Sequence, residues 1–192
     1  MKVAILGESH SDSDALINLL ARKFSLIEFL KMPAKKTATG SMLDNPKVRR
    51  AFRVEFEFEK PDLVILSRDL DAIRKSEDYS QKLEERKEYF SKLKRTFNQK
   101  TLRLLHIYEL EALILADIDS FNKWGDFEVE FVGNPMNQEE PKEYLKLQTK
   151  NNFKESDNPE IFKQLDYEKL EQNCQYFADF SIKFKNLIKE TN

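Results

Sequence analysis

Short apolar runs alternate with segments of helical periodicity along this chain. Each of the runs Lys2–Gly7, Leu63–Ser67 and Leu102–Ile107 is typical of a buried strand. Helical spacing follows the first two runs, at Leu16, Leu19, Leu20 and Phe24, and at Tyr79, Leu83, Arg86, Phe90, Leu93 and Phe97. Strands that alternate with helices indicate a parallel sheet. We therefore predict an α/β fold with a mostly parallel central sheet and helices on both faces.

The remaining segments give a single domain over residues 1–192, with a helical C-terminal extension from about residue 134. Asn45-Pro46 opens a predicted helix, although the alternation over residues 54–58 also fits a strand. The other predicted elements are a second strand at residues 25–30, a surface loop at 32–41, a helix at 109–121, an edge strand at 127–131 and a last helix from about Asp166.

Acidic residues follow the three predicted buried strands. The carboxyl ends of parallel strands line one crevice, so these side chains are expected to converge there. Carboxylates that lie close together stay ionised when a cation neutralises them, and hard oxygen ligands favour Mg²⁺ or Mn²⁺. The candidate catalytic residues are Glu8, Asp69, Asp71, Glu109 and Glu111. The candidate metal ligands are Glu8, Asp12, Asp69, Asp71 and Glu111.

Each of these residue patterns also has a purely structural interpretation. Asp69 and Asp71 would point to the same side of an extended strand, but Asp is also common in turns and helix caps. Glu109 and Glu111 open a predicted helix, where the dipole favours acidic residues, and positions two apart diverge on a helix. One of the two is therefore expected to face the site and the other the surface.

His10 is a candidate phosphate contact, because it lies in the turn that follows the first predicted strand. A solvated loop histidine is the structural alternative. Asp12 and Asp14 likewise fit the start of a helix.

Composition limits the classes of partner. With 32 basic and 34 acidic residues, the chain lacks the basic excess of a strong stand-alone nucleic-acid binder. Cys174 is the only cysteine, which favours a reducing compartment. Residues 1–7 do not resemble a signal peptide, and no apolar run approaches the length of a membrane span. We expect a cytoplasmic protein without a membrane partner.

The segments "VAILGESHSD" and "PDLVILSRDLDA" resemble the Toprim domain, which has a Glu after its first strand and an Asp-x-Asp after a later one. The segments "HIYELEALILAD", "EEPKEYL" and "ESDNPEIFKQLDYEKLEQNC" resemble, more narrowly, the Toprim-like domain-of-unknown-function family 4276, a relative of the nuclease domain of overcoming-lysogenisation-defect proteins. The resemblance spans nearly the whole chain. It differs at Ser9, where Toprim domains usually have Gly.

The resemblance implies a Mg²⁺-dependent nuclease. It would be the nuclease subunit of a two-component phage-defence system whose other component is an ABC-type ATPase. It implies that Glu8, Asp69 and Asp71 bind metal and perform acid–base chemistry, and that Glu109 and Glu111 are an additional acidic element. Lys142, in "EEPKEYL", resembles a lysine of this family and is a candidate phosphate contact, with a solvated helix lysine as the structural alternative. A non-catalytic Toprim-like subunit of an ATPase complex is the alternative. A nucleotide-binding or signalling domain is less favoured, because the chain has no Gly-rich phosphate loop.

Overall fold

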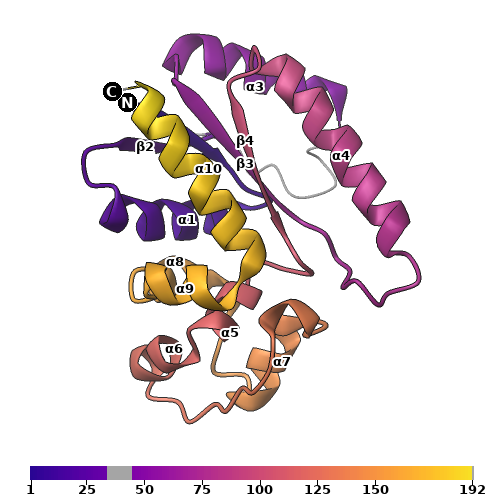
Figure 1. Ribbon diagram of the computed structural model, residues 1–192, viewed down its shortest axis with the longest axis vertical. Helices are drawn as coiled ribbons and strands as arrows, with labels where there is room; N and C mark the ends of the chain where they lie inside the picture. Colours follow the sequence, from indigo (N-terminus) through magenta and orange to yellow (C-terminus); the bar gives the residue numbers. More distant parts are fainter. Residues whose placement is uncertain (34–44, 192) are drawn as a thin grey trace.

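Strands and helices alternate over the first half of the chain in the computed structural model, which describes residues 1–33 and 45–191. This half contains β1 (Lys2–Leu6), α1 (His10–Lys23), β2 (Glu28–Lys31), α3 (Pro46–Glu59), β3 (Leu63–Asp69), α4 (Tyr79–Thr96) and β4 (Thr101–His106). The second half contains α5 (Ala112–Ala116), α6 (Ile118–Gly125), η1 (Pro135–Asn137), α7 (Pro141–Gln148), η2 (Glu155–Asp157), α8 (Asn158–Phe162), α9 (Tyr167–Asn173) and α10 (Gln175–Thr191). Helices α5 to α9 gather at one end of the sheet (Figure 1).

The four strands form one parallel sheet in the order β2-β1-β3-β4. Val3 is opposite Leu63, and Asp69 is opposite His106. The three strands predicted from the apolar runs are therefore neighbours, as expected. All four strands end at the same edge of the sheet, which is where the acidic residues follow.

Alternate side chains of each strand enter two separate cores. Val3 and Ile5 pack with α1 and α10, whereas Ala4 and Leu6 pack with α3 and α4. Helices thus cover both faces of the sheet (Figure 1). This arrangement confirms the predicted α/β class with a parallel central sheet, and it has the layering of a Rossmann-like fold.

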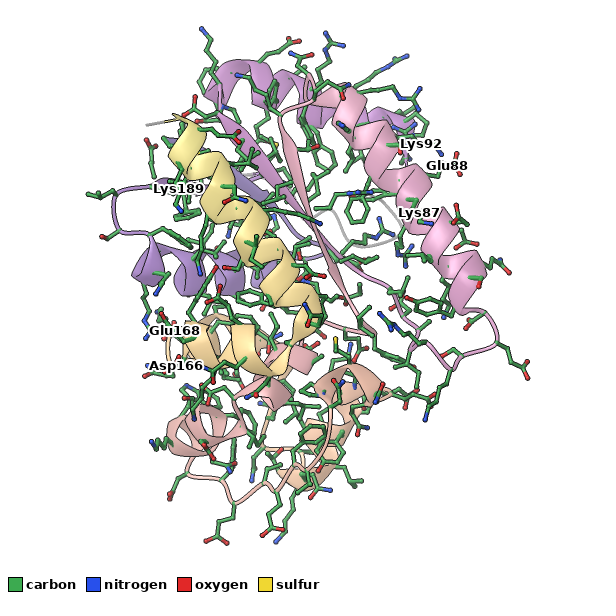
Figure 2. All side chains as sticks on the ribbon, in the orientation of Figure 1. Lys87, Glu88, Lys92, Asp166, Glu168 and Lys189 are labelled. Carbon is green, nitrogen blue, oxygen red and sulfur yellow. The ribbon has the colours of Figure 1, made fainter. Side chains whose placement is uncertain are left out.

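Helix α4 has an apolar face that packs on the sheet and a charged face that points away from it. Tyr89, Phe90 and Leu93 are buried against the sheet. Lys87, Glu88 and Lys92 point away from the sheet on the other side (Figure 2). The outer lysines make ion pairs within the helix, such as Lys92 with Glu88 at 2.7 Å. Such exposed pairs contribute little to stability, so burial of the inner face holds α4 in place.

The structure resolves two segments whose predicted secondary structure was ambiguous or approximate. The segment from Pro46 to Glu59 is helical, because Asn45 caps it and because Phe52 and Phe56, four residues apart, are both buried. The second strand begins at Glu28, three residues later than predicted. Most of the predicted surface loop, residues 34–41, lies outside the described residues.

Two predicted helices are each divided by one non-helical residue. Asp117, with φ −137° and ψ 61°, separates α5 from α6. Cys174, with φ −134° and ψ 96°, separates α9 from α10. Both residues are buried, so the chain turns inside the core and not at the surface.

The predicted edge strand at residues 127–131 is wrong. Both backbone polar groups of Val129 bond to the side chain of Asn122, at 3.0 Å for the N–H and 2.9 Å for the carbonyl. Phe127 and Phe131 pack against helical residues, with Phe127 on Phe121 at 5.1 Å between ring centroids. The alternation of apolar residues therefore serves packing under a loop, and no neighbouring strand is involved.

Candidate functional site

The turn between β1 and α1 presents Glu8 at the carboxyl edge of the sheet. The Gly7 N–H donates to Ser13 Oγ at 3.0 Å, and a Cβ at Gly7 would lie 3.0 Å from Ser13 N. Ser9 caps α1 in a capping box with Asp12. Ser9 has φ −130° and ψ 169°, an extended conformation that any residue adopts. Glycine is therefore not needed at this position, and Ser9 supplies a helix cap in its place.

Glu8 connects β1 to the end of β3. Its Oε1 accepts a hydrogen bond from the Asp69 N–H at 3.2 Å and lies 2.6 Å from Arg68 Nε. The Arg68 side chain is 4% exposed, and its guanidinium lies 4.3 Å from the centroid of the Tyr89 ring. Burial raises the pKa of Glu8, and the charge of Arg68 opposes that rise. Glu8 is thus held at the edge by a buried arginine.

Asp69 lies at the centre of the acidic cluster. It is the last residue of β3 and is partly buried. Burial raises its pKa well above the usual value, and four other carboxylates raise it further, those of Glu8, Asp12, Glu111 and Asp71. The cluster therefore has more negative charge than its cationic neighbours neutralise.

Asp71 does not continue the strand alternation that predicted it beside Asp69. β3 ends at Asp69, and Asp71 has a left-handed φ of 57°. Arg86 of α4 pairs with it, with Nη2 to Asp71 Oδ2 at 2.7 Å. The same guanidinium donates from Nε to the Asp69 carbonyl at 2.7 Å. Tertiary contacts from α4, and not the strand period, therefore orient Asp71.

Glu109 and Glu111 have different partners, and neither is the surface residue that the sequence led us to expect. Glu111 is buried, accepts a hydrogen bond from Asn158 Nδ2 at 2.9 Å, and has its pKa raised to about 7, mainly by burial. Glu109 faces Lys142, whose Nζ lies 3.4 Å from Glu109 Oε1 and 3.6 Å from Glu155 Oε2. The helix begins only at Ala112, after both glutamates. The angle between helical positions therefore does not explain why the two side chains point to different partners.

The phosphate candidates differ in their surroundings. Burial lowers the pKa of Lys142, but the nearby carboxylates, with Glu109 first, raise it above the usual value, so this lysine is charged. His10 is the first residue of α1 and is partly buried at the same edge of the sheet. Lys142 is therefore part of an ion-pair group, and neither residue is a fully solvated side chain.

A buried polar network lies behind the acidic residues. His106 Nε2 lies 2.8 Å from Ser67 Oγ, and His106 Nδ1 lies 3.4 Å from the Tyr176 hydroxyl. Burial lowers the pKa of His106 to about 3, so the ring is neutral. Burial raises the pKa of Tyr176 well above 10.0, and Cys174, Asp69 and Glu111 raise it further. The network is therefore uncharged and does not neutralise the carboxylate of Asp69.

The predicted carboxylates gather without forming a complete set of metal ligands. The pKa of Asp69 is raised by the charges of Glu8, Asp12, Asp71 and Glu111. Glu109, in contrast, faces Lys142. Within residues 1–33 and 45–191, no three His, Cys, Asp or Glu side chains approach closely enough to hold a metal ion. Two of the carboxylates, Glu8 and Asp71, have arginine partners instead.

Sequence reasoning missed these arginines as site residues. Arg86 lies at an apolar position of the helical pattern from Tyr79 to Phe97. A charged residue on the buried face of a helix needs a partner, which is a signal that could have identified it. Asn158 and Tyr176 gave no comparable signal, because each lies far along the chain from the residues it contacts.

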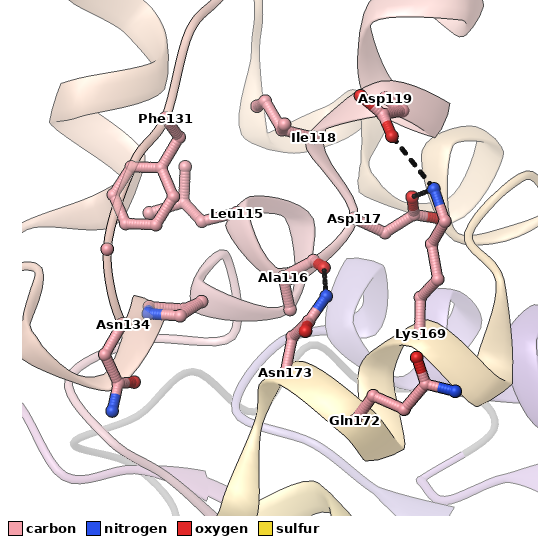
Figure 3. A pocket seen from close by; sticks show the side chains of 12 residues that line it. Leu115, Ala116, Asp117, Ile118, Asp119, Phe131, Asn134, Lys169, Gln172 and Asn173 are labelled. Atoms are coloured by element: carbon pink, nitrogen blue, oxygen red, sulfur yellow. Dashed lines mark hydrogen bonds and ion pairs between the residues drawn. The ribbon is translucent and has the colours of Figure 1, made fainter.

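A separate cavity of about 610 Å³ lies between α5, α9 and the loop around Asn134 (Figure 3). The Asp117 carboxylate accepts a hydrogen bond from the Asp166 N–H at 2.8 Å and pairs with Lys169 Nζ at 3.0 Å. Lys169 also pairs with Asp119 at 3.0 Å. Burial raises the pKa of Asp117, but these donors outweigh it and the net shift is downward. The polar groups here satisfy one another and connect α9 to α5 and α6.

The chain matches no protein-family model, and searches of curated proteins and of solved structures found no match. In the described part of the chain, no helix is long and apolar enough to cross a membrane. The interpretation of the acidic cluster therefore depends on its own chemistry.

Proposed function

We propose that this chain is a Toprim-type nuclease that cleaves nucleic-acid phosphodiester bonds with the help of Mg²⁺ or Mn²⁺. The observation that supports this proposal most strongly is the position of Asp69 at the carboxyl edge of the sheet, where burial, and then four other carboxylates, raise its pKa. Maintaining such repulsion costs stability, and a fold keeps it where the charge has a use.

The chemical type of the donors, and not their spacing in this structure, supports a hard divalent cation. Carboxylate oxygens are the ligands that Mg²⁺ and Mn²⁺ prefer. Asp69, Glu8 and Asp71 would hold the ion only after their carboxylates move closer together than they lie in the described residues, and Asp12 and Glu111 would add negative charge around it. A bound divalent cation lowers the pKa of water and stabilises charge on phosphodiester oxygens.

The protein side chains would perform the remaining chemistry. Glu8 is a suitable general base, since burial raises its pKa toward the working pH while Arg68 fixes its orientation. Lys142 and His10 lie at the same edge and would contact substrate phosphates. Glu109 would hold Lys142 in place, with 3.4 Å between their charged atoms.

A partner is part of the proposal. The net charge of −2 gives weak attraction to nucleic acid, so the chain alone should bind DNA or RNA poorly. An ABC-type ATPase, which the family resemblance implies, would supply the nucleic-acid contacts. The nuclease would then act mainly within that complex.

One observation favours the non-catalytic alternative, in which the chain is a Toprim-like subunit of an ATPase complex. Arg68 and Arg86 pair with Glu8 and Asp71, two of the three proposed ligands. A site with permanent arginine partners would not need a metal ion. Cation binding therefore separates the two functions.

The first experiment measures Mn²⁺ binding by isothermal titration calorimetry for the wild type, Asp69→Asn and Glu128→Gln. Glu128 is exposed and outside the cluster, so its substitution is a matched loss of one negative charge. We expect binding by the wild type and by Glu128→Gln, and at least a tenfold loss for Asp69→Asn. Absence of binding by the wild type would favour the non-catalytic subunit.

The second experiment measures nicking of supercoiled plasmid DNA in Mn²⁺, with the protein alone and with any ABC-type ATPase that is found to be encoded beside its gene. Nicking should increase with the ATPase, should be lost in Glu8→Gln and should persist in Glu128→Gln. Equal nicking by the wild type and Glu8→Gln would reject Glu8 as a catalytic residue.

A further inference from the structure

The outer edge of β4 pairs with no other strand in the part of the chain that the structure describes. β4 is the last strand in the order β2-β1-β3-β4. The Lys100 carbonyl, just before β4, accepts a hydrogen bond from the Val64 N–H of β3 at 2.9 Å. Backbone groups alternate in direction along a strand, so even-numbered residues face β3, and Arg103 and Leu105 face outward. The edge therefore presents N–H and C=O groups to a further strand.

A groove of about 370 Å³ lies at this edge, and we call it the β4 groove. Its lining is Phe90, Ser91 and Lys94 of α4, residues 101–103 of β4, and Lys183 of α10. β4 lies between α10 and α4 in Figure 1. The Arg103 guanidinium lies 5.9 Å from the centroid of the Phe90 ring, a contact that favours its position in the groove. A ligand in the β4 groove would therefore meet both the open strand edge and the charged side chains.

The β4 groove is basic. Lys94, Arg103 and Lys183 are exposed, and within residues 1–33 and 45–191 none of them pairs with a carboxylate. Other lysines of α4 are matched, since Lys87 pairs with Glu84 and Lys92 pairs with Glu88, on the same helix. Three such cations from three elements, in a chain whose net charge is −2, favour an anionic ligand.

An extended peptide fits this edge better than DNA or a second copy of the chain. The outward carbonyls of Arg103 and Leu105 need donors, which a peptide backbone has and a phosphodiester backbone lacks. Two copies of β4 paired edge to edge would bring two sets of groove cations together, and like charges on neighbouring strands repel. An acidic peptide strand would supply both the donors and the negative charge.

We infer that the open edge of β4 binds an extended acidic segment of a partner protein, which adds to the sheet as a further strand and pairs its carboxylates with the cations of the β4 groove. Main-chain hydrogen bonds to Arg103 and Leu105 would supply affinity, and the cations would select acidic side chains. The inference is independent of the proposed function, because the groove and the acidic cluster share no residue.

The first test measures charge selection by fluorescence anisotropy of a labelled peptide of about six residues, the length of a typical strand, with alternating Glu and Val. The triple groove variant combines Lys94→Gln, Arg103→Gln and Lys183→Gln. We expect the wild type to bind, and the triple groove variant to bind at least about tenfold more weakly, since three ion pairs are lost. The same peptide with Lys in place of Glu should not bind.

The matched control removes three charges from the same two helices. It combines Lys87→Gln and Lys92→Gln of α4, which point away from the sheet, with Lys189→Gln of α10 (Figure 2). These substitutions should change the peptide affinity by less than about twofold at physiological salt, because solvent screens distant charges. Equal losses in the control and in the triple groove variant would overturn the role of the groove cations.

A second pair of variants tests strand pairing. Arg103→Gln removes the charge and keeps the backbone N–H, whereas Arg103→Pro removes both. Proline is tolerated on an edge strand where the N–H faces solvent, so Arg103→Pro should fold, which circular dichroism checks. Its peptide affinity should be at least about threefold lower than that of Arg103→Gln, because a hydrogen bond is lost. Equal affinities of the two folded variants would overturn strand addition.

Two N-methylated peptides test the same bonds without a change to the protein. One is methylated at its Glu amides and the other at its Val amides. In an added strand one set of amides faces β4 and the other faces solvent, so one peptide should lose at least about tenfold in affinity and the other should not. Equal affinities of the two peptides would overturn strand addition.

The remaining measurements test the other two occupants. The wild type and the triple groove variant should not differ in binding of labelled single-stranded DNA or in oligomeric state by analytical ultracentrifugation. DNA binding that the triple groove variant loses, without peptide binding by the wild type, would overturn the inference in favour of nucleic acid. A wild-type dimer that this variant loses would overturn it in favour of a second copy. No binding of the acidic peptide by the wild type at millimolar concentration would also overturn it.

Discussion

Two aspartates of this protein lie in comparable positions and have opposite properties. Asp69 ends β3, and Asp117 lies between α5 and α6, so each occupies a break in secondary structure. Burial raises the pKa of both. Four carboxylates raise the pKa of Asp69 further, whereas hydrogen bonds from Asp166 and Ser120 and the charge of Lys169 bring the pKa of Asp117 below its usual value.

This difference in pKa distinguishes Asp117, a structural carboxylate, from Asp69, a candidate functional one. Asp117 has donors for both of its oxygens, so its charge stabilises the fold. Burial and neighbouring carboxylates both oppose the charge of Asp69, so we expect the folded protein to be more stable when that charge is removed. Asp117 lines the cavity, and its carboxylate already has hydrogen-bond and ion-pair partners. In this protein a carboxylate whose charge is opposed by its neighbours therefore indicates a functional site better than the cavity does.

The largest expected effect is on stability at Asp117. Asp117→Ala leaves the Asp166 N–H and the Lys169 amine without their acceptor, so the free energy of unfolding should fall by about 3 kcal/mol. Urea denaturation followed by circular dichroism measures this change. Asp119→Ala is the control, since Asp119 contacts the same lysine from a side chain that is 69% exposed. Equal effects of the two substitutions would contradict a structural role specific to Asp117.

The next effect concerns pH and Glu111, whose pKa is about 7 in the folded state and 4.5 in the reference state. The folded protein holds this proton more tightly than the unfolded chain, so stability falls as pH rises from about 4.5 to about 7 and then levels off. Above pH 7 the ionised, buried carboxylate should cost about 3 kcal/mol. Below pH 4.5 it should cost nothing, because both states are protonated there.

Urea denaturation of the wild type and Glu111→Gln across this pH range measures the contribution of Glu111. The advantage of the Gln variant should appear between pH 4.5 and 7. Glu128→Gln, a change at an exposed glutamate, should run parallel to the wild type. A constant difference between wild type and Glu111→Gln at every pH would mean that packing, and not titration, separates them.

A smaller effect of opposite sign to that of Asp117 is expected at Asp69. Asp69→Asn relieves the repulsion from the neighbouring carboxylates, so it should raise the free energy of unfolding by about 1 kcal/mol at pH 8 without added metal. At pH 4 the gain should shrink, because Asp69 is then protonated in the folded protein. Thermal and urea denaturation at both pH values measure the change. A destabilised Asp69→Asn would place Asp69 with Asp117 among the structural carboxylates.

The smallest effect is expected at Lys169. Its side chain is 41% exposed, and solvent screens its ion pairs with Asp117 and Asp119. Lys169→Gln should therefore lower the free energy of unfolding by only about 0.5 kcal/mol. A loss as large as that of Asp117→Ala would show that the lysine, and not the Asp166 N–H, stabilises the Asp117 carboxylate.

The comparison also shows which parts of the site were predictable. Glu8 and Asp69 could be predicted to meet, because each follows a short apolar run and parallel strands end at one edge. The orientation of Asp71 could not be predicted, because the strand ends at Asp69 and α4 supplies its partner. The edge strand predicted at 127–131 was wrong for a related reason. Alternating apolar residues indicate which side chains are buried, but they do not show whether a strand or a helix packs against them.

The sequence by itself determined the alternation of strands and helices, the parallel sheet and the edge at which the carboxylates gather. Those features depend on local periodicity and on the order of elements along the chain. Only the tertiary structure decided the charge balance of each carboxylate. Arg86 reaches Asp71 from α4 and Asn158 reaches Glu111 from α8, 47 residues away. Burial and charge depend on neighbours that are distant in sequence, and periodicity carries no information about those neighbours.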